Sequence, residues 1–373
     1  MKRLVIVSLV LIVVGFVIHP SPLFAQAAQE IPFDSVPNFL KMPPGLYLGE
    51  NAGIAVNSKG HIFVYTRSGA PGHIIAPQSA QLFEFAPDGA FIRELAQNLY
   101  SMAWAHAVRI DQDDNIWLVD NGSDMIVKLS PAGQVMLVLG RRRESVASTE
   151  VHPPHEPGTP TPPARDTAFN EPTDITWDPE GNIFISDGYK NHSVAKLDKY
   201  GDWVKRIGKG NGAERGDGPG EFNNPHGIAA DAEGNIYVAD RSNLRVQVLD
   251  SDLNFLRNIK IDIPAPPDAT ITGGYSTELA PFQPGAPWAV CITPPGPNQV
   301  LFVADAYPGR VYKVSLDGTV LGYFGTNGKQ LKQFNWIHAI ACPSENEILV
   351  GELLTWRVQK LILKPDQTMT SSR

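Results

Sequence analysis

Short apolar runs separated by turn residues recur along most of the chain, and residues 222–259 show the pattern most clearly. Apolar runs at 228–230, 236–239 and 246–249 are separated by Ala232–Asn235 and by polar residues 240–245. Runs of this length, bounded by Gly, Asn and Asp, predict β-strands, and Gly234 suits a tight turn because glycine accepts a positive φ. Residues 255–259 add a fourth strand, so the segment predicts a four-stranded unit.

The same unit can be aligned six times along the chain. Each copy has an apolar first strand, a turn, and a second strand of the form Asn-Ile-aromatic-aliphatic that is often followed by Asp. Besides 222–250, the paired first and second strands are 52–56 with 61–66, 106–110 with 115–120, 173–177 with 182–187, 288–292 with 300–305, and 338–342 with 347–352. Six four-stranded repeats at this spacing predict an all-β fold, a six-bladed β-propeller.

The sixth repeat ends after residues 357–363 without a fourth strand, whereas residues 46–50 stand just before the first repeat. We predict that this N-terminal strand closes the ring by pairing with the sixth blade, which would cover an exposed strand edge. The predicted organisation is a lead-in at 28–45, the propeller at 46–364 and a disordered tail at 365–373.

The first 27 residues have the pattern of a secretory signal peptide. Lys2 and Arg3 precede an apolar run at 4–18, and small residues offer cleavage after Ala25 or Ala27. An uncleaved membrane anchor is the alternative, but the run of 15 residues is shorter than the roughly 20 that a spanning helix needs. We therefore predict export, to the periplasm or by secretion, with no stable membrane insertion after cleavage.

Composition excludes one class of partner and leaves one question open. The net charge of −8 is of mixed sign with no basic stripe, so we expect no nucleic-acid partner. Cys291 and Cys342 are the only cysteines. After export they could form a disulfide, or both could be buried free thiols, because each lies in an apolar run.

Histidine occupies the same position in alternate repeats. At the start of the first strand the aligned residues are Ala52, His106, Thr173, His226, Trp288 and His338. Alternate blades of a six-bladed ring are about 120° apart and their innermost strands start at the mouth of the central channel, so three imidazoles should converge on the axis. Three His with an open fourth position is the pattern of a catalytic zinc site, although iron, copper or nickel would also accept imidazole.

The alternative is three unrelated histidines that cap strands. The remaining histidines of the mature chain are out of phase, and we expect them in loops or at the surface: His61, His73, His152, His155 and His192.

Residues that follow the second strand of a blade should return to the same mouth, because the first two strands are antiparallel. Arg67, Tyr189 and Arg241 stand there in the first, third and fourth blades. Two guanidiniums and a phenol beside three histidines would suit an anionic substrate such as a carboxylate, although each arginine alone could be a solvated rim residue. Long insertions at 68–79, 141–168 and 262–287 should open on this face too.

An acidic residue recurs at the end of the second strand in every repeat but the first. This regularity predicts a structural role in turns for Asp120, Asp187, Asp240, Asp305 and Glu352.

These motifs resemble a known family over essentially the whole mature chain. The unit at 222–250 is similar to the NHL repeat, and the chain resembles the peptidyl-α-hydroxyglycine α-amidating lyases. The residues that carry the resemblance are His106, Pro225-His226, His338, the Ser186-Asp-Gly-Tyr189 segment, Val238-Ala-Asp-Arg241 and Arg67.

The resemblance implies a zinc ion held by the three histidines, in an enzyme that splits N-acyl- or peptidyl-α-hydroxyglycine into an amide and glyoxylate. It implies that Tyr189 is the base, that Arg67 stabilises charge at the reacting centre, and that Arg241 orients the substrate carboxylate or supports the phenolate.

The chain also departs from the family. Ala339 stands where the family has an aspartate for a structural calcium, so a calcium site is in doubt, and Lys190 stands where a half-cystine would be expected. Other functions stay open: a propeller lactonase, an exported non-catalytic NHL propeller that binds peptide or carbohydrate, or the same chemistry on a small carbinolamide instead of a peptide.

Overall fold

The computed structural model describes residues 28–68, 80–142, 168–271 and 275–364. The predicted signal peptide and tail, most of the insertions at 68–79 and 141–168, and His73, His152 and His155 lie outside these ranges. The described helical segments are short 3-10 turns, and no helix among them is long and apolar enough to cross a membrane.

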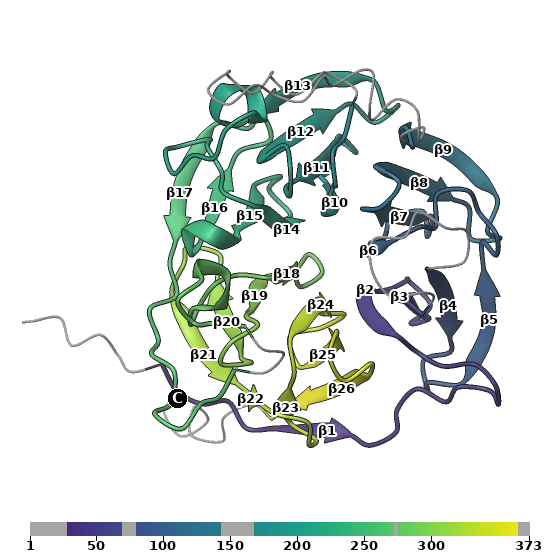
Figure 1. Ribbon diagram of the computed structural model, residues 1–373, viewed down its shortest axis with the longest axis vertical. Helices are drawn as coiled ribbons and strands as arrows, with labels where there is room; N and C mark the ends of the chain where they lie inside the picture. The colour runs from purple at the N-terminus through teal and green to yellow at the C-terminus, as the bar shows by residue number, and fades with distance from the viewer. Residues whose placement is uncertain (1–27, 69–79, 143–167, 272–274, 365–373) are drawn as a thin grey trace, which may run out of the picture.

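Six four-stranded antiparallel sheets stand around a central axis, as the repeats predict (Figure 1). From the axis outward, the first three blades are β2 (Glu50–Val56), β3 (Ile62–Arg67), β4 (Gln81–Phe85) and β5 (Phe91–Leu95); β6 (Ala105–Ile110), β7 (Ile116–Asp120), β8 (Met125–Leu129) and β9 (Val135–Gly140); and β10 (Asp174–Trp177), β11 (Ile183–Asp187), β12 (Ser193–Leu197) and β13 (Trp203–Ile207).

The fourth and fifth blades are β14 (Pro225–Ala230), β15 (Ile236–Asp240), β16 (Arg245–Leu249) and β17 (Phe255–Ile259); and β18 (Ala289–Ile292), β19 (Val300–Ala304), β20 (Val311–Ser315) and β21 (Val320–Phe324). The sixth comprises β24 (Ile337–Ala341), β25 (Glu347–Glu352), β26 (Val358–Leu363) and β1 (Phe33–Val36). A small parallel pair, β22 (Thr326–Asn327) and β23 (Gln333–Phe334), precedes the sixth blade.

An N-terminal strand closes the ring, but it is not the one predicted. β1 pairs antiparallel with β26, so that Phe33 faces Leu363 and Val36 faces Lys360. Residue 50 instead begins β2, the innermost strand of the first blade. The outer edge and the innermost strand are three strand spacings apart, about 14 Å, so one segment could not serve both. Leu46 and Leu48 pack as an irregular segment between the first and sixth blades.

The apolar core is divided among the interfaces between neighbouring blades. Six of the buried clusters each join two adjacent blades; the one between the second and third, for example, packs Trp117 and Ile126 against Ile175 and Ile185. Successive side chains of a strand point to opposite faces of its sheet. Each blade therefore has two faces, and each face packs its apolar side chains against one neighbouring blade. The axis is therefore left free for polar side chains.

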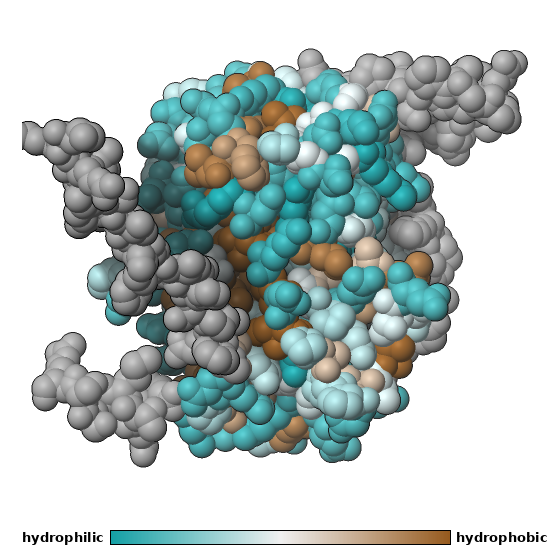
Figure 2. Space-filling model, turned by 90° about the vertical axis from the view of Figure 1, so that its left-hand side faces the viewer, coloured by the Kyte–Doolittle hydropathy of each residue, from teal (hydrophilic) through white to brown (hydrophobic). Residues whose placement is uncertain are grey.

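The outer strands are the least buried of each blade. Viewed from the side that carries β17 and β21, the surface is largely polar, with apolar side chains gathered near its middle (Figure 2). Phe255, Leu256 and Leu321 are among the exposed apolar residues of these two strands.

Cys291 in β18 and Cys342, directly after the end of β24, form a disulfide that joins the fifth and sixth blades. The sequence left open whether these cysteines form a disulfide or stay as free thiols, and the structure shows a disulfide.

The recurrent acids have the structural role that was predicted. All five are at most 1% exposed and accept hydrogen bonds from the loops around them. Asp305, for example, accepts from the backbone N–H groups of Gly309 and Arg310 and from the Tyr312 hydroxyl. A buried carboxylate with several donors holds together the turn between the second and third strands.

Candidate metal centre

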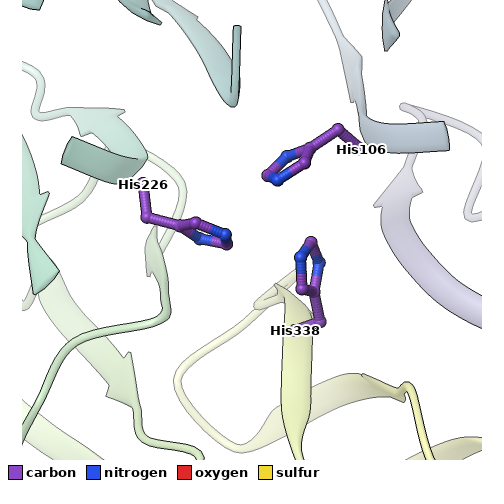
Figure 3. Close-up of side chains that lie close together, drawn as sticks. All are labelled: His106, His226 and His338. Atoms are coloured by element: carbon purple, nitrogen blue, oxygen red, sulfur yellow. The ribbon is translucent and has the colours of Figure 1, made fainter. Parts of the chain in front are cut away.

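Three histidines from alternate blades meet on the axis (Figure 3). His106 lies on β6, His226 on β14 and His338 on β24, and each is at most 5% exposed. One nitrogen from each ring lies within 4.8 Å of the others. Within the described residues, this is the one group of at least three His, Cys, Asp or Glu side chains placed to hold an ion.

The other ring nitrogen of each histidine is fixed by the neighbouring blade. Each Nδ1 faces a backbone carbonyl of the following blade, which can only accept, so Nδ1 carries the proton and Nε2 keeps its lone pair for a ligand. The acceptors are the residues at the same aligned position in the intervening blades: Thr173 for His106 at 2.6 Å, Trp288 for His226 at 2.6 Å, and Ala52 for His338 at 2.9 Å.

The electrostatics favour neutral imidazoles. The pKa of each of the three histidines is well below its usual range, and burial is the main cause. The positive charges of Arg67 or Arg241 act in the same direction. A metal ion binds the neutral ring, so a cluster that resists protonation is prepared to bind one. Three convergent, oriented and neutral nitrogen donors therefore fit a divalent metal of the zinc type.

The other described histidines are elsewhere. His61 is half-buried beside Glu84, with its Nδ1 2.7 Å from the carboxylate. His192 lies in a loop as expected, but it is buried, at 8% exposed, rather than at the surface.

Tyr189 stands directly over the cluster. Its hydroxyl oxygen is 3.4 Å from Nε2 of His106 and 3.3 Å from Nε2 of His226. Gly188 permits this approach: a Cβ there would lie 1.8 Å from the carbonyl oxygen of Pro225, which no side chain could tolerate. The phenol is thus held against the nitrogens that would bind the metal.

Arg67 leaves the end of β3 and is anchored beside the cluster. Its Nε donates to the carbonyl of Ala105 at 2.8 Å and its Nη1 to the carboxylate of Glu50 at 3.0 Å. The guanidinium carbon also lies 4.6 Å from the ring centroid of Trp104. Two hydrogen bonds and a ring contact hold this charge in one place, which is unlike a solvated rim residue.

Arg241 approaches from the fourth blade and is 4% exposed. Its guanidinium carbon lies 3.9 Å from the ring centroid of Trp288 and 5.3 Å from that of Tyr189. With the Asn224 amide oriented to donate to the Gly188 carbonyl at 3.1 Å, its oxygen accepts from Arg241 Nη2 at 2.8 Å. Nε and Nη1 of Arg241 have no partner among the described residues, so this buried cation has donors available for an anion.

One feature of the channel escaped the sequence reasoning. Arg109, three residues beyond His106 on β6, forms a buried ion pair with Asp174 in the same cavity that the histidines line. Most repeats have glycine or alanine at the positions of these two residues, which leaves space on the axis for a long side chain: Gly53, Ala55, Ala107, Gly227, Ala229, Ala289, Ala339 and Ala341. A charged residue among small ones was the signal that could have revealed the pair.

Of the predicted insertions, the described part of 262–287 does reach the histidine face. The indole N–H of Trp288 donates to the carbonyl of Pro281 at 2.6 Å, and the ring of Phe282 packs against Trp288. Trp288 in turn lies 5.2 Å, centroid to centroid, from the ring of His226.

Comparison with known proteins supports the family to which the motifs pointed. The NHL repeat model matches residues 222–249. The chain is 28% identical over 227 residues to a probable peptidyl-alpha-hydroxyglycine alpha-amidating lyase of Caenorhabditis elegans, which covers 57% of this chain and 58% of that protein. It is 28% identical over 346 residues to a peptidylglycine alpha-amidating monooxygenase of Rattus norvegicus, covering 86% of this chain and 31% of that protein.

The chain thus matches less than two thirds of the length of these relatives. Among solved structures, a gluconolactonase of Xanthomonas campestris is similar, with a TM-score of 0.55 and 14% identity over 93% of this chain and 99% of that one. At that identity the likeness concerns the fold alone.

Proposed function

We propose that this chain, a homologue of the peptidyl-α-hydroxyglycine α-amidating lyases that carries an NHL repeat, is itself a zinc-dependent lyase. It would cleave an N-acyl- or peptidyl-α-hydroxyglycine to an amide and glyoxylate. The observation that carries the proposal is the position of the Tyr189 hydroxyl, within 3.4 Å of two of the three convergent imidazole nitrogens.

His106, His226 and His338 are the residues that would hold the zinc ion. Bound there, zinc would supply a Lewis acid that makes a nearby substrate hydroxyl more acidic. The carbonyls that accept from each Nδ1 support this assignment, because such partners orient metal-binding imidazoles in other proteins.

The reaction balances without another reactant. The substrate loses its α-hydroxyl proton, the C–N bond breaks, the oxygen forms the aldehyde of glyoxylate, and the amide nitrogen gains a proton. Tyr189 is the proposed base that takes the hydroxyl proton, and its place beside the imidazoles supports that role.

The two arginines would each interact with a different negatively charged part of the substrate. Arg241 is proposed to bind the carboxylate, because its Nε and Nη1 are buried donors without a partner in the described residues. Arg67 is proposed to stabilise charge at the reacting centre, since Glu50 and the Ala105 carbonyl hold it beside His106 before any substrate binds.

We also propose that the protein is exported. The N-terminal pattern supports this, and the Cys291–Cys342 disulfide is typical of an oxidising compartment.

The first experiment is elemental analysis of the purified mature protein beside its His226→Ala variant, followed by an assay of glyoxylate release from N-acyl-α-hydroxyglycines. We expect about one zinc per chain in the wild type, loss of that metal in the variant, and glyoxylate only from the metal-containing protein. Protein purified without chelators that holds no stoichiometric metal would overturn the proposal. Metal without glyoxylate release would also contradict the lyase, and would direct the next assays to lactones or to simple ligand binding.

A further inference from the structure

A continuous row of aromatic rings leads from the histidines to the surface between the fifth and sixth blades. We call Trp288, Phe282, Trp336 and Tyr275 the aromatic wall. Trp288 lies 5.2 Å from the ring of His226 and 6.3 Å from that of His338, measured between centroids. Phe282 and Trp336 pack on Trp288 at 5.5 and 5.0 Å.

The outer end of the wall is open to solvent. Tyr275 stacks on Phe282 at 4.6 Å and meets the edge of Trp336 at 4.7 Å, yet it is 41% exposed. Trp288 at the inner end is 3% exposed. The exposure of the rings therefore rises with distance from the histidines, as it would along one side of a path that leads into the site.

Two parts of the chain have to come together to build this row. Phe282 and Tyr275 belong to the insertion at 262–287, whereas Trp288 and Trp336 immediately precede the innermost strands β18 and β24. The insertion is tied to the inner end by the bond from the Trp288 indole to the Pro281 carbonyl. Three of the rings, Phe282, Trp288 and Trp336, form a small apolar cluster with Ala306 and Ile271, separate from the six clusters between the blades. Its place beside the histidines points to a role in binding.

We propose that the aromatic wall binds the acyl side of the substrate and selects α-hydroxyglycines in which an aromatic or large apolar group precedes the scissile bond. This inference rests on the proposed function and deepens it. Arg241 lies on the face of Trp288, so a carboxylate bound by it would place the rest of a small substrate against the inner end of the wall. An apolar acyl group could then continue outward along Phe282, Trp336 and Tyr275.

The occupant is identified by the chemistry of the rings. Aromatic side chains offer large apolar area at a low cost in conformational entropy, and ring pairs add attraction beyond the area that they bury. A benzoyl group or a bulky apolar penultimate residue would gain both, whereas an acetyl group would reach little beyond Trp288. Factors of about 10 to 100 are typical of selection by an apolar pocket.

The test uses the purified, zinc-loaded full chain and four small probes. N-Benzoyl- and N-acetyl-α-hydroxyglycine are compared by kcat/KM for glyoxylate release. N-Benzoylglycine and N-acetylglycine, which lack the hydroxyl group and are not cleaved, are compared by calorimetric titration. We expect the benzoyl compound of each pair to be favoured at least tenfold.

Variants locate the preference on the wall. Tyr275→Ala, at a partly exposed ring, should reduce the benzoyl preference several-fold through KM and Kd, and leave the acetyl compounds unchanged. Tyr275→Phe should retain the preference, because the ring is kept. Tyr200→Ala is the matched control, since Tyr200 is 73% exposed on the turn between β12 and β13, away from the wall.

The outcomes separate the two proposals. Equal binding of the two glycine analogues, or a benzoyl preference that Tyr275→Ala does not change, would overturn the aromatic wall as a specificity surface even if glyoxylate is released. A benzoyl preference in binding that Tyr275→Ala removes would support the wall. If glyoxylate is then absent with every probe, the lyase assignment fails and the wall stands.

Discussion

Replacing Arg109 by methionine should destabilise the whole propeller, because its guanidinium contacts residues of several blades near the axis. Nε and Nη2 of Arg109 donate to the two oxygens of Asp174, and the guanidinium also reaches the carbonyls of Ile340 at 3.3 Å and Val290 at 3.4 Å. Asp174 in turn accepts from the backbone N–H of Ile228 at 3.2 Å. These residues belong to the second to sixth blades, so one ion pair links five blades.

The size of the effect follows from burial. The side chains of Arg109 and Asp174 are 19% and 5% exposed. Burial alone would lower the pKa of Arg109, but the Asp174 carboxylate outweighs it and the pKa is raised, so the guanidinium stays charged. Methionine fills similar space without charge, and the carboxylate is then left buried without its cation. Breaking a buried pair in this way costs about 3–5 kcal/mol, on the order of 5–8 °C in melting temperature for a domain of this size.

The assay is urea unfolding and calorimetry on the metal-free protein, so that metal binding does not contribute. The double variant Arg109→Met with Asp174→Asn should recover about half of the loss, because no buried charge remains unpaired. Lys41→Met is the control for an exposed pair: the side chains of Lys41 and Asp88 are 63% and 70% exposed, so about 1 kcal/mol or less is expected. The reasoning is refuted if Arg109→Met costs under about 1 kcal/mol, or if the double variant is as unstable as the single one.

Three further predictions concern the site and the turns. Tyr189→Phe should reduce glyoxylate release at least about 100-fold without loss of metal, and unchanged turnover would remove the base assignment. Gly188→Ala should lower both the melting temperature and activity, because the added Cβ would lie 1.8 Å from the Pro225 carbonyl oxygen. An unchanged melting temperature would show that the backbone at this point can shift to accept the Cβ. Burial raises the pKa of Asp305 from 3.8 to about 7 despite the hydrogen bonds that act to lower it. Its folded pKa exceeds the unfolded one, so its contribution to stability is full below about pH 4 and is lost as the pH rises through about 7. Urea unfolding should therefore show a larger cost of Asp305→Asn at pH 4.5 than at pH 8, by roughly 1.4 kcal/mol per pKa unit, and a cost independent of pH would contradict the assigned titration.

The closing strand shows where local pattern misleads. Residues 46–50 (Leu-Tyr-Leu-Gly-Glu) place leucine at alternate positions, whereas residues 33–36 (Phe-Asp-Ser-Val) do not alternate apolar and polar residues. Which of the two pairs with β26 depends on how far the chain must travel from the outer edge of the sixth blade to the innermost strand of the first. That distance is set by the geometry of the closed ring, and the residues of the two segments do not reveal it.

The surroundings of the histidines show the same limit. Alignment of the repeats brought out His106, His226 and His338 because they share a position in phase. Each Nδ1 partner is a backbone carbonyl. Because every residue has one, these acceptors cannot be recognised from residue types in the sequence. Trp288 was visible at its aligned position, but its stacking on Arg241 depends on how two neighbouring blades face each other.

The sequence by itself therefore determined the all-β architecture, the number of blades and the convergence of three histidines, because strand alternation and repeat phase are properties of local order along the chain. Only the tertiary structure decided the closing strand, the Arg109–Asp174 pair, the Cys291–Cys342 disulfide and the aromatic wall. The physical reason is that each of these joins segments that lie far apart in the sequence. Their separation depends on how the blades pack around the axis, and repeat spacing alone does not encode that packing.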